Sequence, residues 1–205
     1  MTNLSGSSVH DLMARDATFY HQILRDVFKE ENENPTQDEP DDSARARWRL
    51  SYSLIRNFSI IPGHANAEID KEELQSWINT VLELGRGSDR IAVTENYIRR
   101  LLAHSPPDAD GGWPHRCVRD EIERLQSVEL ERGVQLGRYN MRGVHGKAVF
   151  EGGGQERSLA EQYRQYAAVA AAWPRTSALL TVIAKGWERD AEQEDLEAAQ
   201  RKLRS

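Results

Sequence analysis

The sequence predicts an all-α protein, built as an irregular multi-helix bundle or a short helical-repeat-like array of about seven to eight helices. Two observations predict this class. Apolar residues recur three and four positions apart along most of the chain, which is the spacing of one face of a helix. Proline and glycine residues interrupt these periodic stretches at short intervals, as they do between packed helices.

The strongest helix prediction follows Asp70, a residue type that favours the N-cap position. Five apolar residues then occupy every position of one helical face: Leu74, Trp77, Ile78, Val81 and Leu82. Because Trp77 lies at the centre of this stripe, we expect its side chain to be buried.

The first part of the chain is predicted as an amino-terminal helix within residues 1–29, with its apolar stripe between Val9 and Lys29. Residues 30–42, EENENPTQDEPDD, have seven acidic side chains, two prolines and no large apolar residue. Such a segment cannot bury enough apolar surface to offset its ordering entropy, so we expect an acidic, mobile linker. Residues 43–205 are predicted to form one helical domain that ends in a polar carboxy-terminal helix.

The helix predicted over residues 43–59 has two features that compete. Trp48, Tyr52 and Ile55 form a stripe that indicates a core face. Arg45, Arg47 and Arg49 lie two positions apart, so they are expected to spread around the helix, and the acidic linker before it is expected to neutralise them in part. The net charge of −6 disfavours nucleic-acid binding, which depends on an excess of basic residues.

The region 127–154 is ambiguous, because its apolar residues suit both a helix and strand alternation. We favour a helix capped by Ser127, followed by a loop or short hairpin in VHGKAVFEGGG. Two further helices are predicted, from Gln155 to Ala172 and from Pro174 onward. The last of these becomes almost entirely polar in EDLEAAQRK, and we expect this end to project into solvent or to meet a partner.

The loop that precedes Gln155 is the candidate ligand site. Glycines directly before a helix leave backbone amides open to an anion, and nearby arginines add positive charge. The candidate ligand-binding residues are Asn140, Arg142, Gly152, Gly153, Gly154, Glu156 and Arg157. The alternative is an ordinary connection in which Arg157 pairs with a neighbouring glutamate. The segment has neither a P-loop nor a dinucleotide-binding motif.

No other motif indicates a metal, a cofactor or a catalytic group. The histidines lack any ligand spacing, and the single cysteine, Cys117, excludes an intrachain disulfide. DADGG, from Asp108 to Gly112, begins like a calcium loop, but Arg119 stands where the final glutamate is required. We therefore expect a turn with solvent-facing aspartates, no bound metal, no cofactor and no catalytic residue.

The sequence also predicts a cytoplasmic protein without a membrane segment. No apolar run approaches the roughly 20 residues that cross a bilayer. The first residues, MTNLSGSSVHDLMARD, lack the basic and apolar stretches of a secretory signal.

A set of local motifs resembles the carboxy-terminal helical regions of large uncharacterised bacterial proteins. The motifs are DGGWPHRCVRDEIERLQS, NMRGV, GGGQERSLAEQYR and WPRT, and the resemblance covers about Ile61 to Asp195. It implies a bacterial origin and a region that can form the terminal module of a longer polypeptide. It implies no activity and no catalytic residue.

These observations favour a non-catalytic α-helical protein–protein interaction or scaffold module of a bacterial cytoplasmic system, with a protein partner or self-association. One alternative is a small-ligand or anion-binding domain, or an enzyme, that uses the loop over residues 140–157. A second alternative is a nucleic-acid-associated protein, which the net charge makes unlikely.

Overall fold

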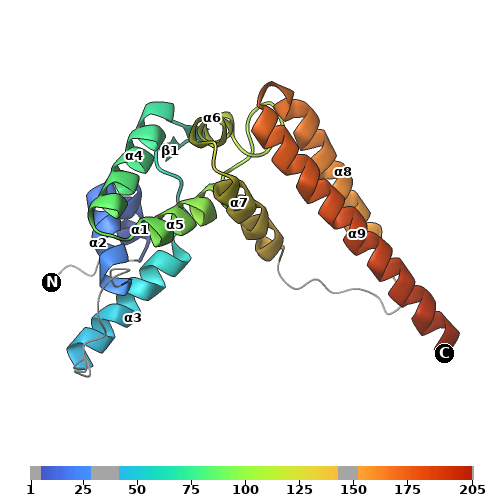
Figure 1. The fold of residues 1–205 in the computed structure, drawn as a ribbon, viewed down its shortest axis with the longest axis horizontal. Helices are drawn as coiled ribbons and strands as arrows, with labels where there is room; N and C mark the ends of the chain where they lie inside the picture. The colour runs from blue at the N-terminus through green and yellow to red at the C-terminus, as the bar shows by residue number, and fades with distance from the viewer. Residues whose placement is uncertain (1–5, 29–41, 143–151, 205) are drawn as a thin grey trace. The chain divides into compact units, whose positions relative to one another are not determined.

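The computed structural model describes residues 6–28, 42–142 and 152–204, and within them it confirms the all-α class (Figure 1). These residues form nine α-helices, a short 3-10 helix and one two-stranded hairpin. The predicted linker at residues 30–42 lies outside the described residues, except for Asp42, which begins a helix. The predicted loop or hairpin at residues 143–151 also lies outside them.

The chain divides into two compact units, residues 1–104 and residues 105–205. The sequence instead predicted an isolated amino-terminal helix and one domain over residues 43–205. The difference arises because the amino-terminal helices pack into the first unit, where Tyr20 and Leu24 are fully buried. The boundary falls just before a loop in which Asp108 binds Arg116 and Trp113 binds the Ser105 carbonyl, all within the second unit.

The first unit contains five α-helices and the hairpin. Its elements are α1 (Gly6–Arg15), α2 (Ala17–Val27), α3 (Asp42–Asn57), β1 (His64–Ala65), β2 (Glu68–Ile69), α4 (Lys71–Gly87) and α5 (Ile91–Ala103). Helix α2 packs against α1, α3 and α4, and α4 also packs against α5. The antiparallel hairpin pairs His64 with Ile69, and Asp70 then caps α4 by accepting a 2.9 Å hydrogen bond from the Glu73 amide.

The single amino-terminal helix that the sequence predicted is divided into α1 and α2 at Asp16. The backbone of Asp16 is extended, and its carboxylate accepts hydrogen bonds from the amides of Thr18 and Phe19 at 2.9 and 3.0 Å. An aspartate in this position satisfies amides that the start of a helix leaves without partners. This break adds one helix to the predicted number.

An aromatic cluster around Trp77 joins the helices of the first unit. Trp77 is buried, as predicted, and its ring lies 4.7 Å from Tyr20 and 6.3 Å from Phe58, measured between centroids. Its indole N–H donates a 3.0 Å hydrogen bond to the Met13 carbonyl of α1. One side chain of α4 therefore contacts α1, α2 and the segment that follows α3.

Helix α3 confirms the helix predicted over residues 43–59, but its apolar stripe is only partly a core face. Ile55 is buried, whereas Trp48 is 45% exposed. The difference arises because α3 packs on the first unit through its carboxy-terminal half, and its residues from Arg45 to Leu50 are exposed.

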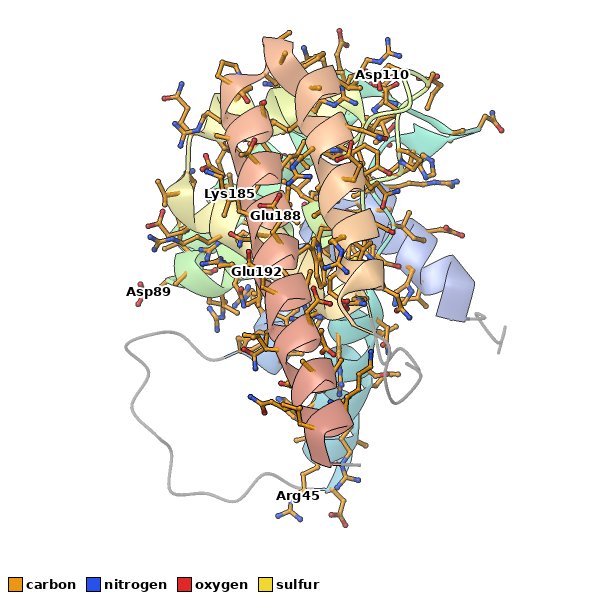
Figure 2. All side chains as sticks on the ribbon, turned by 90° about the vertical axis from the view of Figure 1, so that its right-hand side faces the viewer. Arg45, Asp89, Asp110, Lys185, Glu188 and Glu192 are labelled. Carbon is orange, nitrogen blue, oxygen red and sulfur yellow. The ribbon has the colours of Figure 1, made fainter. Side chains whose placement is uncertain are left out.

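The second unit is built around a long antiparallel pair of helices, α8 (Gly154–Val169) and α9 (Pro174–Arg204), connected by the 3-10 helix η1 (Ala170–Ala172) (Figure 2). Helices α6 (Arg116–Leu125) and α7 (Val128–Met141) pack against α9. Ser127 caps α7, as predicted, by accepting a 3.1 Å hydrogen bond from the Leu130 amide. The predicted helix after Ser127 is therefore confirmed.

The loop that opens the second unit carries two ion pairs, each with one buried partner. The Asp108 carboxylate is fully buried and accepts hydrogen bonds from the Arg116 guanidinium at 2.8 and 2.9 Å, which holds the pKa of Asp108 well below its usual value. Arg119 is fully buried and pairs with Asp110 at 2.7 Å. The prediction of solvent-facing aspartates was thus wrong for Asp108, whose buried carboxylate is paired with Arg116 of α6.

Replacement of Trp77 by alanine is expected to reduce the free energy of unfolding by about 3–5 kcal/mol, the usual cost of removing a large core aromatic. Equilibrium unfolding in urea measures this change. Leu50→Ala serves as the control, because Leu50 is 63% exposed and its loss should change stability by no more than about 0.5 kcal/mol. A cost below about 1 kcal/mol for Trp77→Ala would contradict a central role in the core.

A second prediction concerns His21, whose Nε2 lies 3.0 Å from the Ser88 hydroxyl. Burial, with the charges of Arg25 and Arg90, lowers the pKa of His21 from 6.5. The unfolded chain therefore binds a proton near pH 6.5 that the folded chain does not, so stability should be constant above this pH and fall below it.

The loss in stability should not exceed about 1.4 kcal/mol per pH unit for this one group. Urea unfolding between about pH 7.5 and 5.5 measures it, and His21→Gln should flatten the curve in this window. Equal slopes for the parent protein and the variant would show that His21 is not responsible.

Candidate functional site

The predicted ligand-site residues lie on the second unit, at the facing ends of α7 and α8. Asn140 is an exposed residue of the last turn of α7, and Arg142 follows that helix. Gly152 and Gly153 precede α8, and the rest lie in its first turn: Gly154, Glu156 and Arg157. The structure thus brings the two halves of the predicted site near each other through the ends of two helices.

Arg142 and Glu156 form an ion pair that joins α7 to α8. The Arg142 Nη2 atom lies 2.5 Å from Glu156 Oε1, and both side chains are largely buried. The Arg142 guanidinium also lies 4.8 Å from the centre of the Trp187 ring of α9, in a cation–π contact. Arg142 therefore connects all three helices, which is a structural role.

The anion position at the start of α8 is occupied by a carboxylate of the protein itself. Asp195 of α9 accepts a 2.8 Å hydrogen bond from the Gly153 amide and pairs with Arg157 at 2.6 Å. Arg157, with the Gly153 amide, holds the pKa of Asp195 below its usual value. The sequence predicted both the anion-attracting amide and the ion pairing of Arg157, but expected a neighbouring glutamate as the partner.

The glycines before α8 allow a close approach of backbones. A Cβ atom on Gly153 would collide with the backbone of Ala191, and one on Gly152 would collide with the Asp195 carboxylate. Gly154, by contrast, has open space where a Cβ would stand. Gly153 is therefore required by the packing of α8 on α9, whereas a side chain at Gly152 would have to displace only the Asp195 carboxylate.

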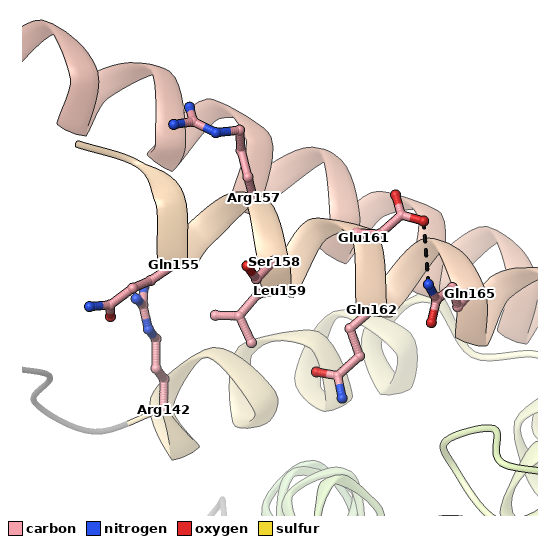
Figure 3. A pocket seen from close by; sticks show the side chains of 8 residues that line it. All are labelled: Arg142, Gln155, Arg157, Ser158, Leu159, Glu161, Gln162 and Gln165. Atoms are coloured by element: carbon pink, nitrogen blue, oxygen red, sulfur yellow. Dashed lines mark hydrogen bonds between the residues drawn. The ribbon is translucent and has the colours of Figure 1, made fainter. Parts of the chain in front are cut away.

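A surface hollow of about 920 Å³ lies beside this site (Figure 3). Of the predicted site residues, Arg142 and Arg157 contribute to its lining, which consists of Arg142, Gln155, Arg157, Ser158, Leu159, Glu161, Gln162 and Gln165. In Figure 3 the Arg157 side chain extends toward α9, whereas Arg142 rises from α7 beside Gln155. The two guanidinium groups do not converge on one point.

The lining has little capacity for catalysis. Among the lining residues that the structure describes, the one hydroxyl, that of Ser158, donates a 3.1 Å hydrogen bond to the Gly154 carbonyl, and none is a histidine that could act as its base. Within residues 6–28, 42–142 and 152–204, no group of three or more histidine, cysteine, aspartate or glutamate side chains is placed to hold a metal ion. No helix among the same residues combines the length and apolar character that a membrane span needs.

Comparison with family models, curated proteins and solved structures found no match for this chain. The resemblance to the carboxy-terminal regions of large bacterial proteins therefore stays a prediction.

The close approach at Gly153 leads to a prediction with a matched control. Gly153→Ala should lower the free energy of unfolding by about 1–3 kcal/mol, because the added methyl group must displace the backbone of α9 at Ala191. Gly154→Ala, one residue further on, should change it by no more than about 1 kcal/mol, since its Cβ meets no atom. Urea unfolding of both variants tests this, and equal stabilities would contradict the packing described.

Proposed function

We propose that this chain is a non-catalytic helical protein–protein interaction module. The observation that carries the proposal is the outer face of α9, which presents apolar side chains to solvent. Val182, Leu196 and Leu203 are 45%, 60% and 88% exposed. Leucines of this exposure are unfavourable in water and are typical of surfaces that another molecule covers.

These apolar residues lie on one stripe of α9. Leu196 and Leu203 are seven positions apart, and Val182 precedes Leu196 by twice that distance. A seven-residue repeat returns to nearly the same side of a helix, so the three side chains face the same way. Their side of α9 is opposite the one that packs on α8, where Ala184 and Ala191 are buried.

The end of α9 is available for such a contact. Gly152 faces Asp195, and α9 continues from Leu196 to Arg204 beyond this point. The sequence predicted that this polar end projects into solvent or meets a partner, and the exposure of its two leucines favours the partner.

A second copy of the chain is the occupant that we propose. Two antiparallel copies that cross between Ala199 and Gln200 bring Leu196 of each opposite Leu203 of the other. Ala199 is small and exposed near this crossing, so the two helices can approach closely. Each copy thus supplies the apolar side chains that cover the exposed leucines of the other.

The alternative function, anion binding by the loop over residues 140–157, has weaker support. Asp195 already accepts the Gly153 hydrogen bond and pairs with Arg157, and Glu156 pairs with Arg142. An external anion would have to displace carboxylates that are tethered to the same molecule. A bacterial cytoplasmic setting for the interaction module rests on the sequence alone.

Light scattering coupled to size-exclusion chromatography tests the proposal. The parent protein is expected to form a dimer whose fraction increases with concentration. The double variant Leu196→Glu, Leu203→Glu should be monomeric, because two buried carboxylates would face each other across the contact. Leu136→Glu is the control, since Leu136 of α7 is equally exposed at 62% but lies outside the stripe.

Circular dichroism melting should show that all three proteins remain folded. A parent protein that is monomeric at every concentration would refute self-association through α9. A double variant that dimerises as well as the parent would place the contact elsewhere.

A further inference from the structure

Helix α3 of the first unit carries a second exposed surface, formed by arginines and aromatic residues on one face. Its members follow one another at three and four positions, so a helix places them in a single stripe. We call this surface the arginine–aromatic stripe; it consists of Arg45, Trp48, Arg49, Tyr52 and Arg56. Arg47 lies on the opposite side of the helix and does not belong to the stripe.

The two aromatic residues of the stripe form one rigid slab. The rings of Trp48 and Tyr52 are stacked, with centroids 5.1 Å apart and planes inclined by 7°. The Trp48 indole N–H donates a 3.1 Å hydrogen bond to the Val27 carbonyl, which fixes the ring on the end of α2. The side chain is nevertheless 45% exposed. A large apolar surface is thus both held in place and open to solvent. Binding to it therefore costs little side-chain entropy.

The arginines of the stripe border this slab on the solvent side. Arg45, Arg49 and Arg56 are exposed, and Arg45 extends away from the end of α3 (Figure 2). The basic surface continues onto α5, where Arg100 donates a 3.3 Å hydrogen bond to the Arg56 carbonyl and lies over the ring of Tyr97. The one acidic residue of α3, Asp42, approaches Arg45 only to 3.7 Å and is itself fully exposed.

Several other arginines of the protein hold the fold together. Arg116, Arg119 and Arg142 each form an ion pair with a carboxylate at 2.5–2.8 Å within their own unit. Arg49, in contrast, has no hydrogen bond or ion pair with any residue that the structure describes, whereas Arg45 is already paired within α3. The stripe therefore presents the guanidinium group of Arg49 outward.

We propose that the arginine–aromatic stripe docks an acidic segment of another protein. An apolar side chain of that segment covers Trp48, and its carboxylates pair with Arg49 and Arg56. Tryptophan, tyrosine and arginine are the residues that contribute most to binding energy at protein interfaces, and a preformed apolar anchor ringed by charges is the usual form of such a site. Planar guanidinium groups match carboxylates in a bidentate geometry.

A protein segment fits the stripe better than a nucleic acid does. Single-stranded nucleic acids use several separate aromatic platforms, one for each base, whereas Trp48 and Tyr52 stack on each other and leave one shared slab. The chain also has a net charge of −6, which repels a long polyanion more strongly than a short acidic peptide. This surface lies on a different unit from the α9 stripe, so it goes beyond the interaction proposed above and does not depend on it.

Fluorescence anisotropy of a labelled peptide tests the proposal with the full chain. The probe is a short peptide of glutamates interrupted by leucines. One comparison peptide has glutamine in place of every glutamate, and an oligothymidine of equal length is the third ligand. The parent protein should bind the acidic peptide, and the affinity should fall as the salt concentration rises from about 50 to 200 mM, because the charges are exposed.

The variants separate this face from the rest of the helix. Arg49→Gln with Arg56→Gln should weaken binding of the acidic peptide about tenfold, as expected for the loss of two exposed ion pairs. Arg47→Gln with Arg15→Gln removes the same charge away from the stripe and should weaken binding less than about twofold. Trp48→Ala should weaken it as well, and Trp48→Phe, which keeps an aromatic ring, should recover part of the loss.

Four results would overturn the proposal. They are the absence of any anisotropy change up to about 1 mM protein, equal binding of the uncharged peptide, equal losses in the two double variants, and tighter binding of oligothymidine than of the acidic peptide. The last result would make α3 a nucleic-acid surface instead. Circular dichroism melting of each variant confirms that a loss of binding does not come from unfolding.

Discussion

The second unit depends on how closely α8 approaches α9. Their backbones come so near at Gly153 and Ala191 that no side chain fits between them. Such a contact favours this register, because sliding α9 by one turn would bring a larger residue, such as Trp187 or Glu194, against Gly153. The register determines which carboxylate meets the start of α8, and that carboxylate is Asp195. It also determines how far α8 covers α9, and therefore where the exposed end of α9 begins.

This constraint explains why a segment with the composition of a ligand loop has a structural role here. Glycines and a free helix start attract anions in general. In this chain the Asp195 carboxylate of the adjacent helix occupies that position. Because the fold holds this carboxylate close to Gly153, its effective concentration there is high. Arg142 and Glu156 act in the same way on the other side of α8, since they join α7 to α8 through a short, largely buried contact. Polar residues that suggest chemistry in the sequence thus stabilise the packing of three helices.

The sequence predicted best where the cause of a structure is local. The caps at Asp70 and Ser127 each depend on residues within one helical turn, and the burial of Trp77 was predicted from the apolar stripe of its own helix; all three are confirmed. The break at Asp16 was also local and was missed, although an aspartate before Ala17 is a usual start signal.

Contacts between distant residues were not predictable in this way. Arg157 and Asp195 lie 38 positions apart, and nothing in their spacing shows that α8 and α9 are antiparallel neighbours. The stripe of α3 shows a different limit. Periodicity locates Trp48 on the apolar side of a helix, but the same pattern serves a core and an interface. A core face and an interface are distinguished only by how α3 packs, which is through its carboxy-terminal half.

The carboxylate of Glu123 at the end of α6 has a mechanical consequence for α9. It accepts hydrogen bonds from the Thr176 amide at 2.8 Å and the Thr176 hydroxyl at 3.1 Å, and so anchors the first turn of a helix of 31 residues. At a rise of 1.5 Å per residue this helix is a rod about 46 Å long. The rod is held again further along, where Asp195 binds the start of α8, so it cannot pivot about Glu123 alone. A molecule that binds α9 near Leu203 would therefore act on α8 and α9 together as one rigid pair.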